Sequence, residues 1–255
     1  MSRNNIEIRI MKGIKKIAIV VAMDSELELI QKSTFEIKDV IQEQTFEFFV
    51  GSFKDYPEFE IILSKSGIGK VNSAICASKI IEKFSPDLFI SSGVCGCLNK
   101  TTGIIQGDIV VPLSVCYHDA YCGDKKGQIQ GMPELFKTAE FSEEFIVWCR
   151  TTLPIRNVYG CRMISGDWFV DSIDVAEKIY ADFCKEDERV FGIDMESGSI
   201  AQTCHIYSVP FFGIRIVSDT PLMEGQPKYE DFWLRAPGDL NCSLMGVLEF
   251  LKTKC

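Results

Sequence analysis

Only two histidines occur among the 255 residues of this chain, and 36 aspartates and glutamates outnumber 27 lysines and arginines, which gives a formal net charge of −9. Nucleic acids and anionic membranes are bound through basic surfaces, so this charge balance argues against both kinds of partner. No stretch of about 18 uninterrupted apolar residues is present, and we therefore expect no membrane span. Residues 1–15 contain no apolar run with a small-residue cleavage site, which argues against export and predicts a cytoplasmic protein.

Metal ligands and activated nucleophiles are equally scarce. His118 and His205 stand in no triad context, and no serine occupies a G-x-S-x-G turn. We interpret His205 as a structural helix residue and leave His118 as either structural or part of a site. Cys95 and Cys97 flank a glycine, but no second pair follows at zinc-ligand spacing, so the sequence predicts neither a metal nor a cofactor. The eleven cysteines, an odd number in a long chain, are interpreted as reduced, buried thiols.

Strand and helix patterns alternate along the chain. The apolar patterns predict strands at 16–23, 46–53, 59–64, 87–92, 107–111, 157–165 and 211–217, and helices from 25 onward and at 69–84, 141–152, 172–184, 199–206 and 242–253. Such alternation is typical of a largely parallel sheet with helices on both faces. No linker divides the chain, so we predict a single-domain three-layer α/β/α fold with a mixed, largely parallel central sheet over residues 16–255, preceded by an N-terminal extension at 1–15.

The candidate site residues lie where predicted strands end. The segments concerned are 23–26, 66–70, 93–96, 165–170 and 218–219. Because strand ends at one edge of an open α/β sheet converge on one crevice, we expect these segments to line a common pocket. Asp219 lies just after the strand predicted at 211–217, and this position favours a chemical role. Glu196 precedes a helix, where an acid serves either chemistry or the helix dipole.

Other residues near these ends carry alternative interpretations. Arg215 lies inside a buried strand and must be paired, with Asp194 or Glu196 as its predicted partner. Trp168 either stacks on a planar ligand or packs in the core. The segment 66–70 does not have the Walker spacing, so a tight turn into a helix explains its glycines.

Eight segments together carry a family resemblance. In chain order they are AMDSE (22–26), SGIGK (66–70), SSGVCG (91–96), GDIVV (107–111), YHDA (117–120), SGDWFV (165–170), DMES (194–197) and VPFFGIRIVSD (209–219). Their order and spacing resemble the 5′-methylthioadenosine/S-adenosylhomocysteine nucleosidases of the nucleoside phosphorylase superfamily. The resemblance spans residues 16 to 253 and implies a nucleoside phosphorylase-like fold that hydrolyses the N-glycosidic bond of 5′-substituted adenosines without a cofactor.

The resemblance also implies roles for particular residues. Asp219 matches the general acid that protonates adenine N7, with Ser218 orienting its carboxyl group. Glu26 matches the residue that activates water, and Glu196 the acid that binds the ribose hydroxyls. The remaining matches line the substrate: Met195 packs on the ribose, Phe169 stacks on adenine, Val170 reads the base edge through its backbone, and Met23, Ile68 and Tyr229 surround the 5′-thio group.

Some positions depart from the family pattern. Val94 stands where the family has a serine near the ribose or the water, and Cys95 and Cys97 replace small residues. The stretch between His118 and Gly131 is shortened and polar. In the family it reaches toward the partner's 5′-pocket, so we expect a homodimer with residues 115–131 near the interface, and the identity of the 5′-group stays open.

Two rival functions remain. A phosphate-dependent purine nucleoside phosphorylase needs arginine and serine hydroxyls at the strand-end loop. The turn after Ser91 and Ser92 offers neither, and Glu26 would repel an anion, which favours water as the nucleophile. The second rival is a catalytically silent nucleoside-binding protein with the same fold, which would have no use for a proton donor at Asp219.

Overall fold

The structure is a computed structural model that describes residues 13–100, 103–152, 157–184, 190–223, 229, 232 and 237–254. The predicted extension at 1–15 lies mostly outside these residues, so its boundary stays a prediction. Ile14 is described and is buried in the core. None of the described helices is long and apolar enough to cross a membrane.

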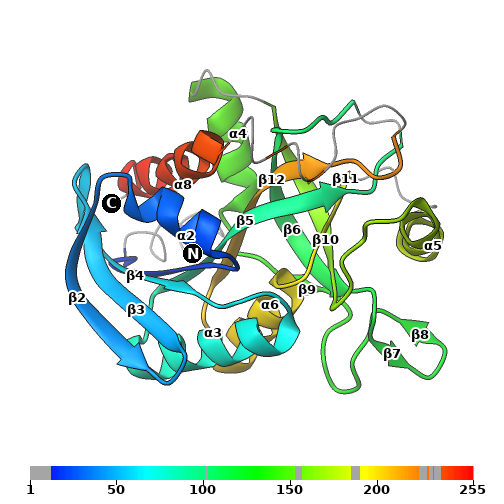
Figure 1. Cartoon of the computed structure of the whole chain (residues 1–255), viewed down its shortest axis with the longest axis horizontal. Helices are drawn as coiled ribbons and strands as arrows, with labels where there is room; N and C mark the ends of the chain where they lie inside the picture. Colours follow the sequence, from blue (N-terminus) through cyan, green and yellow to red (C-terminus); the bar gives the residue numbers. More distant parts are fainter. Residues whose placement is uncertain are drawn as a thin grey trace, which may run out of the picture.

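A mixed ten-stranded sheet forms the centre of the molecule (Figure 1). Its strands are β1 (Lys16–Val21), β2 (Phe35–Glu43), β3 (Phe46–Phe53), β4 (Tyr56–Lys65), β5 (Leu88–Cys97), β6 (Ile109–Tyr117), β9 (Phe136–Lys137), β10 (Val158–Ser165), β11 (Val190–Asp194) and β12 (Phe211–Asp219). The order is β11-β10-β6-β12-β5-β1-β4-β3-β2, and β9 pairs with β6. The short strands β7 (Tyr121–Cys122) and β8 (Lys125–Lys126) form a separate hairpin.

Helices cover both faces of the sheet. They are α2 (Asp24–Gln31), α3 (Lys70–Phe84), α4 (Ser142–Thr152), α5 (Ile173–Phe183), α6 (Ser197–Tyr207) and α8 (Pro237–Lys252). Alternate residues of β1 serve the two faces, because successive side chains of a strand point to opposite sides. Ile17 and Ile19 pack in the core beneath α2, α4 and α8, whereas Ala18 and Val20 pack in the core beneath α3 and α6. The predicted three-layer, mixed and largely parallel fold is confirmed (Figure 1).

Strand β5 divides between two neighbours. Its first half, Leu88–Ser91, pairs in parallel with β1, and its last residues, Gly96 and Cys97, pair with β11 in antiparallel fashion. Along most of its length it also pairs with β12. The strands β11-β10-β6-β12-β5 therefore close on themselves, and a crevice opens where β5 leaves β1. Ligands of open α/β sheets bind at such switch points.

The strand predicted at 87–92 is longer than the sequence indicated. We expected 87–92 to end in a loop at 93–96, which is wrong, because the backbone of Gly93 to Gly96 continues the ladder with β12 from Arg215 to Asp219. The strand that opens at 107–111 leads to Tyr117, as expected, because β10 pairs with it along its whole length.

Candidate active site

One pocket at the fork of β5 contains most of the predicted site residues. About 640 Å³ of space, its mouth included, lies between Ala22, Met23, Glu26, Ile68, Val94, Cys95, Gly96, Trp168, Phe169, Val170, Ile193, Asp194, Met195, Glu196, Ser218, Asp219 and Tyr229. The structure thus brings together every predicted catalytic and substrate-binding residue. Of the predicted supporting residues, Asp194 and Val94 also line this pocket, whereas Arg215 lies beneath it in a buried network.

Glu26 occupies the first turn of α2 and folds back over the start of its own helix. Its Oε2 accepts hydrogen bonds from the backbone amides of Ala22 (2.9 Å) and Met23 (3.0 Å), and its Oε1 accepts one from the amide of Val94 (3.2 Å). Burial raises the pKa of Glu26 even though these three amides act to lower it. A carboxylate with a raised pKa at a pocket wall has the properties of a general base.

Glu196 immediately precedes α6, as predicted, but it interacts with another helix. Its Oε1 accepts a hydrogen bond of 2.9 Å from the amide of Gly69, the residue before α3. Burial, and then the nearby negative charge of Asp194, raise the pKa of Glu196 to about 7, while the Gly69 amide and Arg215 act to lower it. The acid is therefore more than a first-turn partner of its own helix dipole.

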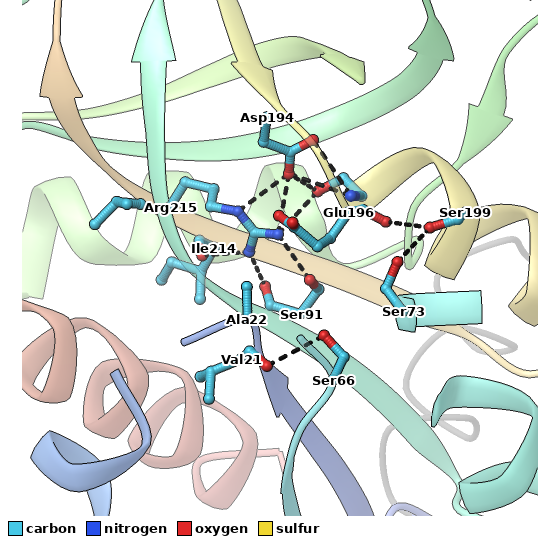
Figure 2. A network of polar contacts seen from close by, with 12 residues as sticks. Val21, Ala22, Ser66, Ser73, Ser91, Asp194, Glu196, Ser199, Ile214 and Arg215 are labelled. Carbon is cyan, nitrogen blue, oxygen red and sulfur yellow. Dashed lines mark hydrogen bonds and ion pairs between the residues drawn. The ribbon is translucent and has the colours of Figure 1, made fainter. Parts of the chain in front are cut away.

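Arg215 is fully committed to a buried network (Figure 2). Its Nη2 lies 3.0 Å from Asp194 Oδ2, so Asp194 is the partner among the two acids predicted from the sequence. The guanidinium also donates to the carbonyl and hydroxyl oxygens of Ser91 and to the hydroxyl of Ser197. An isolated charge in this place would be very costly, so the pairing is required for folding. It also leaves Arg215 without spare donors toward the pocket.

Asp219 is turned toward the pocket by a β-bulge. Val217 pairs with Cys95, and Asp219 pairs with the next residue, Gly96, so Ser218 is an extra residue in the ladder. The Ser218 hydroxyl lies 2.6 Å from Asp219 Oδ1 and 3.0 Å from the carbonyl oxygen of Cys95. This contact fixes one carboxyl oxygen of Asp219 and places the group at the pocket wall.

Aromatic side chains form the mouth of the pocket. Phe169 is 51% exposed, and its ring meets that of Tyr229 edge-on with centroids 5.4 Å apart. The Tyr229 hydroxyl lies 3.5 Å from the sulfur of Met23. Trp168 is 47% exposed, so the core-packing interpretation of this residue is wrong. Exposed aromatic faces beside carboxylates suit a planar, hydrogen-bonding ligand.

The histidines and cysteines lie mainly outside the chemistry of the pocket. His118 is buried, which lowers its pKa, and His205 lies on α6, and neither residue lines the pocket. The ten cysteines in the described part of the chain form no disulfide with one another, and eight of them are buried as predicted, whereas Cys122 is half-buried and Cys242 is exposed. Within that part no three His, Cys, Asp or Glu residues are placed to hold a metal ion. Cys95 is the only cysteine in the pocket wall described.

Sequence reasoning did not single out several wall residues. Ala22, Gly96 and Ile193 line the pocket, and Gly69 supplies the amide that holds Glu196. Gly96 falls inside the strand-end segment 93–96, and Ala22 directly precedes the segment 23–26, so a signal was available for both. Nothing in the sequence indicated the role of the Gly69 amide, because every residue type except proline carries a backbone N–H donor.

Comparison with known proteins gives consistent results. The phosphorylase superfamily model matches residues 16–236. A 5′-methylthioadenosine/S-adenosylhomocysteine nucleosidase of Staphylococcus aureus (strain JH9) is 31% identical over 223 residues, which cover 86% of this chain and 93% of the relative. The crystal structure of such a nucleosidase from Neisseria meningitidis in complex with methylthio-immucillin-A has a TM-score of 0.81 and 29% identity, and covers 94% of this chain and 100% of that one. The S-adenosylhomocysteine nucleosidase of Streptococcus pyogenes in complex with 5-methylthiotubericidin has a TM-score of 0.81 and 27% identity, covering 94% and 98%.

Proposed function

The chain belongs to the phosphorylase superfamily and, within it, to the 5′-methylthioadenosine/S-adenosylhomocysteine nucleosidases, and we propose on that premise that its pocket hydrolyses the N-glycosidic bond of 5′-substituted adenosines. The products are adenine and a 5′-substituted ribose. The observation that carries the proposal is the convergence of Asp219, Glu196 and Glu26 on one pocket beside exposed aromatic rings.

Departure of adenine requires a proton, because the adenine anion is a poor leaving group. We assign this proton transfer, to N7 of the base, to Asp219. Its carboxyl group lies in the pocket wall, and Ser218 fixes one of the two carboxyl oxygens. The base stacks on Phe169, and the backbone beside Val170 reads its edge. A positioned acid of this kind contributes roughly 10²–10⁴-fold to a rate.

The ribose becomes positively charged as the base leaves. Glu196 accepts hydrogen bonds from the ribose hydroxyls, and this interaction strengthens as charge develops on the ring. Met195 packs on the sugar, and Glu26 takes a proton from the attacking water. Met23, Ile68 and Tyr229 surround the 5′-substituent. No step in this mechanism calls for a metal or an organic cofactor.

The described pocket wall supports water rather than phosphate as the nucleophile. It contains no arginine, lysine or histidine, Arg215 is paired with Asp194, and Glu26 and Glu196 would repel an anion. We therefore expect purified protein to release adenine from 5′-methylthioadenosine at the same rate with and without millimolar phosphate, measured by chromatography of the free base.

The same assay separates the rival functions. Strict dependence on phosphate would establish a phosphorylase and overturn the water mechanism. Binding of adenosine analogues without any release of adenine would establish a catalytically silent binding protein. A panel of 5′-methylthio, 5′-homocysteinyl and 5′-deoxy substrates then ranks the 5′-groups, since Val94 and the short hairpin of β7 and β8 depart from the family pattern there.

A homodimer is the second part of the proposal. The adjacent helices α3 and α6 expose Val71 (66%), Ile75 (45%) and Ile206 (58%), and Tyr121 of the predicted 115–131 interface region is 55% exposed. Exposed apolar side chains on adjacent elements are typical of a protein interface. Light scattering after size exclusion at micromolar concentration is expected to give twice the chain mass of 28.7 kDa, and a monomeric mass would contradict the dimer.

A cytoplasmic location is proposed on separate grounds. Free thiols persist in reducing compartments, and the ten cysteines described form no disulfide with one another. Recovery of the natural protein in an extracellular or periplasmic fraction would contradict this location.

A further inference from the structure

Three charged residues outside the pocket wall join two of the loops that build it. Asp119, which follows β6, accepts hydrogen bonds from the ammonium group of Lys70 (2.6 Å) and from the backbone amide of Asp167 (2.8 Å). Asp167 in turn accepts one from the backbone amide of Lys70 (2.7 Å). The contacts form a closed triangle between the start of α3, the end of β6 and the loop after β10. We refer to these three residues as the loop clamp.

Asp167 acts as the cap of a helix that belongs to another part of the chain. The residue at the N-cap position of α3 is Gly69, which has no side chain with which to cap, and its φ of 94° favours glycine. The carboxylate of Asp167 takes the place of a capping side chain and lies so close that a β-carbon on Gly69 would be 2.8 Å from its Oδ1. A negative charge at this position is also favoured by the helix dipole.

The start of α3 holds two carboxylates through successive amides. The amide of Gly69 donates to Glu196, and the amide of Lys70 donates to Asp167. Asp167 directly precedes Trp168 and Phe169, which line the mouth of the pocket. The same helix end therefore contacts the proposed ribose acid and the proposed base-binding loop.

We propose that Asp167, held by Asp119 and Lys70, is a positioning residue that fixes the base-binding loop to the start of α3 and so keeps the Gly69 amide on Glu196. The inference rests on the proposed nucleosidase function. It assigns the three residues a task in aligning base and ribose, although none of them lines the pocket described. Misplacement of reacting groups by about 1 Å can reduce a rate on the order of 10²-fold.

The body of α3 has a separate anchor, so the clamp can be removed without detaching the helix. The hydroxyls of Ser73 on α3 and Ser199 on α6 lie 2.6 Å apart, and Ser73 also lies 2.8 Å from the carbonyl oxygen of Gly69. Loss of the Asp167 carboxylate is therefore expected to loosen the first turn and the loop, while the rest of the helix stays in place.

The test compares two substitutions at Asp167 with a matched control on the same helix. In Asp167→Ala, we expect kcat/KM for adenine release to fall about 30-fold or more, with KM raised. Asp167→Asn keeps an acceptor oxygen for the Lys70 amide and is expected to stay within about threefold of the wild type. The control is Lys79→Met, which removes the ion pair of Lys79 with Glu43 (2.7 Å), similarly half-buried but remote from the pocket.

A pH profile separates positioning from a general loss of stability. The Gly69 amide acts to lower the pKa of Glu196, so loosening it raises that pKa and moves the acidic limb of kcat/KM to higher pH in Asp167→Ala. Lys79→Met is expected to lower the melting temperature without moving the limb. An Asp167→Ala enzyme with an unmoved limb, or with kcat/KM within threefold of the wild type, would overturn the inference.

Failure of the underlying function would look different. A wild-type protein that releases no adenine would refute the proposed nucleosidase function. The positioning role of the loop clamp would then be tested by ligand binding instead of by rate. Calorimetric titration with adenine should then show weaker binding to Asp167→Ala than to Asp167→Asn and Lys79→Met. Equal affinities of the three variants for adenine would by themselves refute the positioning role.

Discussion

An Asp219→Asn variant is expected to release adenine about 10³-fold more slowly than the wild type while unfolding at the same temperature. Asparagine has the shape of aspartate and can still accept the hydrogen bond from Ser218, so the β-bulge and its contact with Cys95 need not change. What is lost is an acidic proton for N7 of the base. Turnover of 5′-methylthioadenosine and thermal unfolding, measured on the same preparation, check both halves of the expectation.

A change of leaving group provides the sharpest control. A riboside whose leaving group departs without protonation, such as a nitrophenyl riboside, should lose much less in Asp219→Asn than the adenosine substrate does. Ser218→Ala is expected to show a smaller loss of about tenfold or less, since it removes orientation only. Near-normal adenine release by Asp219→Asn would defeat the assignment of the general acid.

The parts of the fold that could be predicted are those in which the local apolar pattern of the sequence reflects burial. β1 is a continuous apolar run after Lys16, and β12 is one up to Val217, broken only by Gly213 and Arg215, because helices cover both faces of each strand. The ends of these strands place Met23 and Asp219 at the crevice. β2 gave no such signal, because most of its residues are exposed and the strand is held through its ladder with β3. Edge strands of this kind show little apolar periodicity.

The path of β5 could not be predicted, for a different reason. Gly93 and Gly96 are typical of a turn when only their neighbours are considered. Their strand conformation depends on pairing with β12, more than 100 residues further along the chain, and with β11. Tertiary pairing overrides the local preference here, and it produces the fork at which the pocket opens.

In the candidate site, too, some features could be predicted from local sequence and others depend on tertiary contacts. Acids at strand ends could be found from the sequence, because strand ends converge and carboxylates carry chemistry. The hydrogen bond from Gly69 to Glu196 and the capping of α3 by Asp167 could not. The first joins residues 127 positions apart and the second residues 97 positions apart, and each has a backbone amide as one partner.

Glu196→Gln is expected to stabilise the protein at pH 8 while it impairs the reaction. Burial and Asp194 raise the pKa of Glu196 from an ordinary value of 4.5 to about 7 in the folded state. The folded state therefore holds a proton that the unfolded chain has released. The contribution of the protonated Glu196 to the free energy of unfolding is fully present below pH 4.5, declines as the pH rises through about 7, and is lost above it. The loss amounts to about 3 kcal/mol at most. Glutamine is neutral at every pH and can still accept from the Gly69 amide.

Denaturant unfolding at pH 4 and at pH 8 checks the sign of this effect. The wild type and Glu196→Gln should unfold alike at pH 4, and the variant should be the more stable at pH 8. Glu28→Gln, on the exposed face of α2, should not diverge from the wild type in this way. Parallel stability curves would show that the Glu196 carboxyl is not perturbed. Adenine release should fall on the order of 10²-fold in Glu196→Gln, because a neutral amide cannot balance the charge of the ribose. Opposite changes in stability and rate would mean that the carboxylate weakens the fold near neutral pH and is retained for its chemistry.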